Sequence, residues 1–219
     1  MTRSLSQPKP QGYLPHDLLW GFTSAYLPAD APAWVVSALA ERPPVVVRRA
    51  VGRPGWIAVG VRGKQRDQRF AGWMPVLAVS HCVRPEQLVH SQGWQSLAEA
   101  DYPVIQALKR VAPVLHQSDW RWGVTGSLGF QLASGIKVIH PASDLDLLLR
   151  APTPLSRLQA QHLLAQMSDV PAAVDVQVQC PHGAVALREW ACSTARVLLK
   201  SQSGPLLVSD PWAQEAVVA

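Results

Sequence analysis

Two short segments of the chain combine the residue types that bind a divalent metal and a polyphosphate. The first, Gly123-Val124-Thr125-Gly126-Ser127, is a small turn after an apolar strand, and the second is Ser143-Asp144-Leu145-Asp146-Leu147. Residues i and i+2 of a strand project from the same face, so Asp144 and Asp146 point the same way. Paired carboxylates on a strand are unfavourable, and Mg²⁺, which is held by one or two carboxylates plus substrate phosphates, would remove that cost. Mn²⁺ is the alternative metal.

A third carboxylate lies on a later strand. Residues 174–178 alternate valines with Asp175 and Gln177. If this strand neighbours the first with its faces aligned, Asp144, Asp146 and Asp175 converge on a site for two metal ions and in-line phosphoryl transfer. Asp175 is also our candidate for the base that accepts the proton of the attacking hydroxyl.

The glycine and serine of the first segment suit a polyphosphate. Gly126 and Ser127 stand where a helix is expected to begin, so backbone N–H groups and a hydroxyl can meet phosphate oxygens there. A lone Asp-x-Asp or Gly-Ser is common, and each alone is more often an exposed strand end or an ordinary turn. Their conjunction in this order predicts a metal-dependent transferase.

The charge of the chain is uneven. Residues 1–85 carry eleven Lys/Arg against four Asp/Glu, within a total net charge of +5. This basic half suits a phosphate-rich ligand or an acidic protein, although a solvated basic surface has the same composition. The cluster consists of Arg48, Arg49, Arg62, Lys64, Arg66 and Arg69. We take Arg62, Arg66 and Arg69 as candidate substrate ligands, together with Lys200, which is equally compatible with a surface role.

Composition excludes several classes of protein. With 219 residues, 48% of them apolar, the chain can bury a real core. It has no apolar run long enough to span a membrane and begins without the apolar region of a signal peptide. Its three scattered cysteines indicate a reducing compartment, and we expect a cytoplasmic protein. No motif for reading nucleic acid is present.

Composition and hydrophobic pattern divide the chain into three parts. Residues 1–15 form a Pro-rich leader, residues 16–84 a small basic strand-rich domain, and residues 85–219 the catalytic domain. In the first domain we expect strands at 44–50 and 55–61 and a helix at 34–39. In the second we expect strands at 120–125, 144–149 and 174–178, and helices at 104–115, 128–134, about 154–167 (capped by Thr153) and 184–199. This pattern predicts an α+β fold.

Taken together, these residues resemble a known superfamily. Gly126-Ser127, Asp144-Leu145-Asp146 and the later Asp175 resemble the nucleotidyltransferases typified by DNA polymerase beta, which implies a catalytic domain with a mixed sheet and helices. The gap between Ser127 and Asp144 is longer than is usual in that superfamily. It holds residues 135–140, which we expect to form a hairpin or an extended loop.

Nearly the whole chain, from residue 16 to about 212, resembles a narrower family. The motifs are His16-Asp17-Leu18-Leu19-Trp20, Gly60-Val61-Arg62-Gly63 with Arg66, Gln68 and Arg69, the Gly-Ser and Asp-x-Asp segments, Val174-Asp175-Val176-Gln177, Glu189-Trp190 and Gly204-Pro205. This is the malonate decarboxylase holo-acyl-carrier-protein synthase family, also called phosphoribosyl-dephospho-CoA transferases. The resemblance implies transfer of a prosthetic group from 2'-(5''-triphosphoribosyl)-3'-dephospho-CoA to a serine of the decarboxylase acyl carrier protein, with release of pyrophosphate.

Other functions fit parts of the same pattern. They are the corresponding synthase of citrate lyase, a small-molecule nucleotidyltransferase that uses ATP, and a CoA- or nucleotide-binding module without catalysis. His16-Asp17 fits either a catalytic dyad or a structural pair at the start of an element. Five tryptophans of the first half are candidates for stacking on adenine or for the core: Trp20, Trp34, Trp56, Trp73 and Trp94.

Overall fold

The first sheet is built from the N-terminal third of the chain. In the computed structural model, which describes residues 12–65, 67–90 and 93–213, it has five antiparallel strands in the order β4-β3-β2-β1-β5. The strands are β1 (Leu18–Trp20), β2 (Val45–Val47), β3 (Trp56–Arg62), β4 (Arg69–Pro75) and β5 (His81–Val83). Helix α1 (Ala33–Leu39) and the 3-10 turns η1 (Ser24–Tyr26) and η2 (Val76–Ala78) accompany them. The expected helix and both expected strands are therefore present, the first strand being shorter than predicted.

The two faces of this sheet differ in chemistry because successive side chains of a strand alternate. One face carries Val59, Val61 and Met74 into a core that also includes Val35 and Leu39 of α1. The other face carries the residues paired across β3 and β4, namely Trp56 with Pro75, Ala58 with Trp73, Gly60 with Ala71 and Arg62 with Arg69. This second face has small residues between arginines and tryptophans.

The second sheet has six strands in the order β11-β10-β9-β8-β7-β6. They are β6 (Arg121–Val124), β7 (Leu145–Arg150), β8 (Val174–Cys180), β9 (Gly183–Ala186), β10 (Val197–Lys200) and β11 (Pro205–Val208). The helical elements are α2 (Pro85–His90), η3 (Gly93–Ser96), α3 (Pro103–His116), α4 (Gly126–Ser134), α5 (Arg157–Gln166) and α6 (Leu187–Cys192). Strands β7 and β8 are parallel and the other neighbours are antiparallel, so the sheet is mixed. The predicted α+β class is confirmed.

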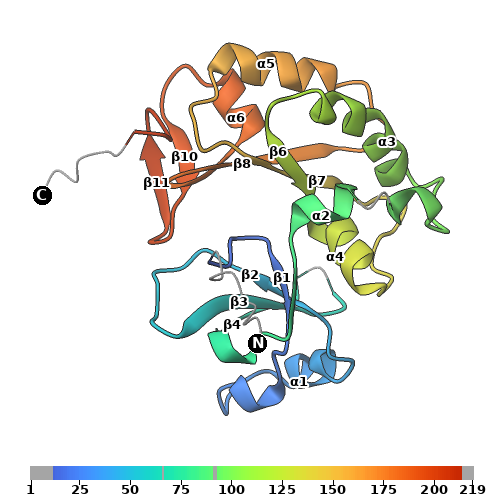
Figure 1. The fold of residues 1–219 in the computed structure, drawn as a ribbon, viewed down its shortest axis with the longest axis vertical. Helices are drawn as coiled ribbons and strands as arrows, with labels where there is room; N and C mark the ends of the chain where they lie inside the picture. Colours follow the sequence, from blue (N-terminus) through green and yellow to red (C-terminus); the bar gives the residue numbers. More distant parts are fainter. Residues whose placement is uncertain (1–11, 66, 91–92, 214–219) are drawn as a thin grey trace, which may run out of the picture.

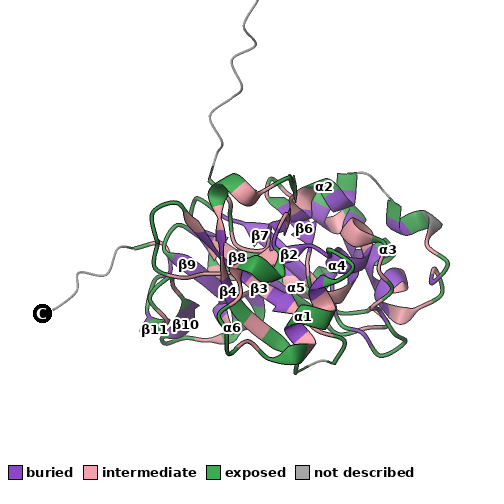
Figure 2. Cartoon of the chain, turned by 90° about the horizontal axis from the view of Figure 1, so that it is seen from below, coloured by how far each residue is buried: buried purple, intermediate pink, exposed green. Residues whose placement is uncertain are grey.

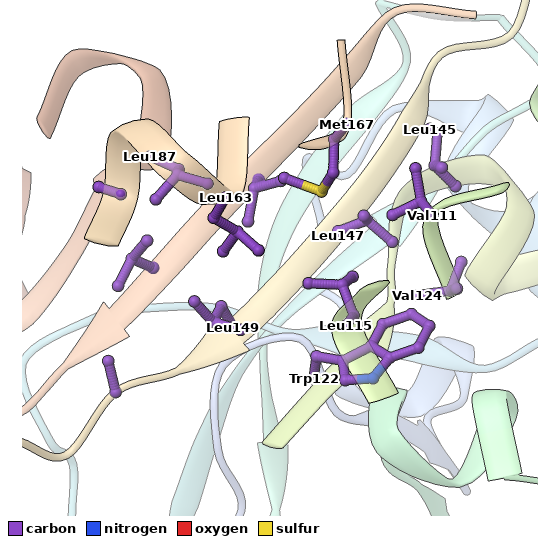
Figure 3. Close-up of a cluster of buried hydrophobic side chains, with 14 of the residues drawn as sticks. Val111, Leu115, Trp122, Val124, Leu145, Leu147, Leu149, Leu163, Met167 and Leu187 are labelled. Atoms are coloured by element: carbon purple, nitrogen blue, oxygen red, sulfur yellow. The ribbon is translucent and has the colours of Figure 1, made fainter. Parts of the chain in front are cut away.

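Leucines of β7 anchor the core of this part of the chain. Leu145, Leu147 and Leu149 are almost completely buried and lie opposite Val124 and Trp122 of β6 or beside Val176 and Val178 of β8. Figure 3 shows them among side chains of the covering helices, such as Val111 of α3 and Leu163 of α5, and beside Met167, which follows α5. Since alternate residues of β7 face this core, Asp146 and Arg150 point to the opposite face.

The two sheets lie face to face. Figure 1 shows α3, α5 and α6 on one side of the second sheet and the first sheet on its other side, with α1 beyond. In Figure 2 buried residues concentrate in the central strands, while exposed residues mark α1 and the loops at the rim. No helix among the described residues is long and apolar enough to cross a membrane.

One predicted helix is wrong. Residues 184–199 form β9, the six-residue helix α6 and β10 instead of one long helix. The chain turns back directly after β8, so that Gln179 pairs with Ala184, and Lys200 then pairs with the same alanine from the other side. Short apolar runs fit either structure, and here the neighbouring strands supply the hydrogen bonds that decide it.

Two boundaries also differ from expectation. Ser156, and not Thr153, caps α5, because its side chain accepts a bond from Gln159 N and the Gln159 side chain bonds back to Ser156 N. Helix α4 begins at Gly126, two residues earlier than expected, and ends at the predicted Gly135. Residues 135–144 contain no helix or strand, in keeping with the expected extended loop.

A buried ion cluster joins the two sheets. Arg150 of β7, 6% exposed, places its Nε 2.8 Å from Glu86 Oε1 and a terminal nitrogen 3.6 Å from Asp17 Oδ1. Asp17 is fully buried, and this burial raises the pKa of its carboxyl group while Arg150 opposes the rise. The cluster therefore ties the first sheet, α2 and β7 to one another.

We predict that Arg150→Met destabilises the protein by roughly 3–5 kcal/mol, because it removes the nearest opposite charge from the fully buried Asp17 and from the partly buried Glu86. Urea unfolding at pH 7 measures this. Arg121→Met is the matched control, since Arg121 pairs with Arg150 across β6 and β7 but is exposed; we expect a change within about 0.5 kcal/mol. Equal losses in both variants would contradict the prediction.

Candidate active site

A cavity of about 570 Å³ lies between the two sheets. The first sheet contributes the small and basic residues of its second face, and the second domain contributes the start of α4 and the middle of β7. Its polar lining consists of His16, Arg48, Arg62, Arg69, Thr125 and Asp146. Both domains are therefore needed to form it.

Two of the three predicted carboxylates lie side by side. Asp146 of β7 is directly opposite Asp175 of β8 in the parallel register, so both side chains project from the sheet face that looks toward the first sheet. Asp146 is half-buried and Asp175 exposed. The predicted adjacency of these two strands is thus present.

The third carboxylate stands apart from this pair. Asp144 is exposed and precedes β7, where a position within the strand was expected. Among the described residues, no three His, Cys, Asp or Glu side chains are gathered closely enough to hold a metal ion. The expected three-carboxylate cluster is therefore not assembled here. The paired carboxylates do match the donor type and number that Mg²⁺ takes alongside substrate phosphates.

The Gly126-Ser127 turn is packed against Asp146. Thr125 N donates to the Asp146 backbone oxygen at 2.9 Å, which places the first turn of α4 beside the carboxylate strand. Gly126 has φ +61°, and a Cβ on it would lie 1.8 Å from Asp146 Oδ2. Glycine is therefore required twice at this position, for its backbone conformation and for the space that Asp146 occupies.

Arg62 links this turn to the first sheet. Its guanidinium donates to Ser127 Oγ at 2.8 Å and lies 6.0 Å from the centre of the Phe130 ring. Burial and the neighbouring Arg69 lower the pKa of Arg62, while Asp146 acts in the opposite direction. Arg69, which is exposed and pairs with Arg62, also lines the cavity. A cationic rim thus faces the carboxylates.

The other two predicted ligands are Arg66 and Lys200. Arg66 lies outside the described residues. Lys200 and Gln179 both pair with Ala184, so their side chains project from the same face of the sheet. Lys200, however, is exposed, is two strands away from β8, and does not line the cavity. The structure therefore gathers Gly126, Ser127, Arg62, Arg69 and Asp146, whereas Lys200 is outside the cavity lining and acts on it only through its charge.

His16 has a more specific place than its sequence position indicates. It adopts φ +76°, which is uncommon for a residue with a side chain. Its Nε2 lies 2.7 Å from Gln177 Oε1 and 3.5 Å from an Arg49 nitrogen. Burial and the cations Arg49, Arg150 and Lys200 lower the pKa of His16 to about 4. His16 is therefore a neutral imidazole at physiological pH, facing the cavity.

Asp17 holds the backbone at this point. Its Oδ2 accepts from Leu14 N at 2.9 Å, closing the turn that holds His16. Of the two roles considered for His16-Asp17, a catalytic dyad or a structural pair, Asp17 has the structural one. In the sequence, the only indication of this arrangement is a histidine next to an aspartate before an apolar strand. That pattern does not predict the left-handed backbone conformation of His16.

The fold and site define a two-domain protein whose cleft offers arginines and a helix start opposite Asp146, with Asp175 beside it on the next strand. Residues 14–85 match the family described as the phosphoribosyl-dephospho-CoA transferase MdcG N-terminal domain, and residues 87–211 match the corresponding C-terminal domain. The chain belongs to the phosphoribosyl-dephospho-CoA transferase family.

Curated relatives agree over most of the chain. A Pseudomonas fluorescens protein named phosphoribosyl-dephospho-CoA transferase is 52% identical over 200 residues, covering 91% of this chain and 94% of its own. An Azotobacter vinelandii protein of the same name is 50% identical over 206 residues, covering 92% and 95%. No solved structure matches the chain, so the nucleotidyltransferase fold stays a prediction.

We predict that Gly126→Ala destabilises the protein by more than the backbone strain at this position accounts for. Gly135→Ala is the matched control, because Gly135 also has positive φ (+71°) but a Cβ there meets nothing within 4 Å. We expect Gly135→Ala to cost about 1 kcal/mol in urea unfolding and Gly126→Ala to cost at least about 1 kcal/mol more, because the Asp146 carboxylate must move. Equal losses would show that the close approach is relaxed without cost.

We predict that His16 makes stability depend on pH. Because its pKa is about 4 in the folded state against 6.5 for an ordinary histidine, the unfolded chain binds the extra proton between these values. Stability should fall as pH drops from 6.5 to about 4, by up to about 1.4 kcal/mol per pH unit from this residue. His16→Asn, which tolerates the left-handed backbone, should have a shallower slope in urea unfolding over this range. Parallel curves for the two proteins would refute the assignment.

Proposed function

We propose that this protein transfers phosphoribosyl-dephospho-CoA from 2'-(5''-triphosphoribosyl)-3'-dephospho-CoA to a serine of the malonate decarboxylase acyl carrier protein, releasing pyrophosphate. The observation that carries this proposal is the hydrogen bond from Arg62 to Ser127, which joins a guanidinium of one domain to the helix start of the other beside Asp146. Polyphosphate recognition combined with paired carboxylates is the arrangement that a metal-assisted phosphoryl transfer needs.

The triphosphate lies at the arginine end of the cleft. Arg62 and Arg69 provide charge-assisted hydrogen bonds to phosphate oxygens, and the start of α4 at Gly126 and Ser127 provides N–H groups and a hydroxyl. These groups bind the β- and γ-phosphates and stabilise pyrophosphate as it leaves. Mg²⁺, with Mn²⁺ as the alternative, would be held by Asp146 and Asp175 and would neutralise charge on the phosphoryl oxygens.

The carrier serine approaches from the side of Asp175. Its Oγ forms a bond to the α-phosphorus while the bond from that phosphorus to the pyrophosphate oxygen breaks. The hydroxyl proton passes to a carboxylate, for which we assign Asp175 because it is exposed on the carboxylate face and can meet a protein substrate. Positioning and electrostatic stabilisation then account for most of the rate enhancement.

Charge and cysteine chemistry support the proposed partner and compartment. The basic surface of the first domain suits the acidic face of an acyl carrier protein. Cys82, Cys180 and Cys192 are unpaired thiols, and burial raises the pKa of Cys82 to about 11. We assign the reaction to the cytoplasm, where free thiols persist.

The test is the intact mass of apo acyl carrier protein from malonate decarboxylase after incubation with the enzyme, Mg²⁺ and the triphosphoribosyl donor. We expect a gain equal to the donor minus pyrophosphate. Asp146→Asn and Asp175→Asn should each lower the rate by about 100-fold or more, and chelation of the metal should abolish it.

Asp119→Asn is the control for these variants, because Asp119 is exposed in the loop between α3 and β6 and, unlike Asp175, is not paired with Asp146; it should retain full activity. A mass gain seen only on the citrate lyase carrier protein would identify that carrier as the partner. Transfer of a nucleotide from ATP would indicate a small-molecule nucleotidyltransferase. Binding of the donor without any transfer would leave a binding module.

A further inference from the structure

A second cavity, of about 410 Å³, lies at the other end of the first sheet. It is bordered by the end of β2, by the tryptophans of β3 and β4, and by the turn between β10 and β11. Its characteristic lining residues are Tyr13, Arg48, Arg49, Trp56, Trp73 and Gln202. The reaction proposed above involves no residue of this cavity.

The same face of β3 and β4 contributes residues to both cavities. Trp56 and Arg62 lie on the same face of β3, six residues apart, which corresponds to about 20 Å along an extended strand. On this face Ala58, Gly60 and Ala71 lie between the tryptophans and the arginines. Ala58 is buried and the Arg48 side chain runs across Gly60, so an elongated ligand that follows this face from one cavity to the other passes over Arg48.

Arg48 stands between the cavities and lines both. Its backbone N donates to Ala58 O at 2.9 Å and its Nε donates to Val59 O at 3.0 Å. A Cβ on Gly60 would lie 3.5 Å from Arg48 Cδ, so the side chain runs across the glycine. The Nε atom of Arg48, bonded to Val59, is therefore about 10 Å along β3 from Arg62. The surface thus presents cations at two separated points.

The second cavity adds aromatic surface to this charge. Trp56 and Trp73 are half-buried, and the Arg53 guanidinium lies 4.5 Å from the centre of the Trp56 ring. The Nε atom of Arg49 is buried without a hydrogen-bond partner. Indole rings beside guanidinium groups suit a ligand that continues from a phosphate into a partly apolar chain.

We propose that the second cavity binds the pantetheine arm of the donor and that Arg48 binds the diphosphate joining this arm to adenosine. The proposal rests on the proposed function for the identity of the donor. That donor carries phosphates at two points, a triphosphate on the added ribose and a 5'-diphosphate on adenosine, separated by two ribose rings. Arg62 with Arg69 and Arg48 match these two points, and the tryptophans follow Arg48 where the pantetheine chain follows the diphosphate.

The test compares two ligands that differ in the pantetheine arm. Isothermal titration calorimetry should give the wild-type protein at least a tenfold lower Kd for dephospho-CoA than for ADP. Trp73→Ala should reduce this preference to about twofold. Gln202→Trp should do the same by filling the cavity from an exposed turn, where the fold tolerates the change.

Two controls separate the cavity from general damage. Trp20→Ala removes a half-buried tryptophan of the same sheet that contacts His81 and lines neither cavity. Ser203→Trp places the same bulk one residue beyond Gln202, at an exposed position outside the cavity lining. Both should keep the wild-type preference.

A preference that survives in both cavity variants, or is absent from the wild type, overturns the proposal. Weaker binding of apo carrier protein with an unchanged ligand preference also overturns it, because the carrier would then occupy this surface. If the wild type shows the preference but transfers nothing in the mass assay, the proposed function fails and the pantetheine site stands.

Discussion

The arrangement of the two domains depends on a guanidinium held away from water. Arg150 lies between Asp17 and Glu86, and a buried arginine is tolerated only where opposite charges and hydrogen bonds replace its hydration. Arg150 is four residues beyond Asp146 on β7, Asp17 adjoins His16, and Glu86 lies in the first turn of α2. One ion cluster therefore fixes how the carboxylate strand faces the first sheet.

Close backbone packing strengthens the same arrangement. A Cβ on Gly123 would lie 2.2 Å from the Pro85 carbonyl carbon, so α2 rests directly on β6. Helix α4 follows β6 after a single residue, Thr125, whose N–H is bonded to β7. The start of α4 thus has little freedom relative to Asp146, and the Arg62–Ser127 bond connects it to the other domain. Such preorganisation is what electrostatic catalysis of phosphoryl transfer requires.

The opposite charges of the two domains meet across the cleft. The first domain brings Arg48, Arg62 and Arg69 to one wall, and the second brings Asp146 to the other, with the exposed Asp175 beside it on β8. A polyphosphate ligand is attracted to the first wall and repelled by the second unless a cation lies between them. The excess of basic residues in the N-terminal third, which composition alone left open between solubility and binding, therefore has a location consistent with ligand binding.

Local patterns in the sequence were enough to predict the local features. Alternation predicted β7 and β8, helical spacing predicted α3, and Gly126-Ser127 with Asp146 marked the site, because these patterns depend on residues a few positions apart. They could not predict the structure of residues 184–199, because the pairing of β9 with β8 and with β10 decides it. They also did not predict that Asp144 precedes β7. Folding in three dimensions brought Arg62 to Ser127, set His16 against Gln177 and separated Lys200 from the cavity. These contacts join residues 65 to 161 positions apart, or depend on strand order, and no local pattern encodes either.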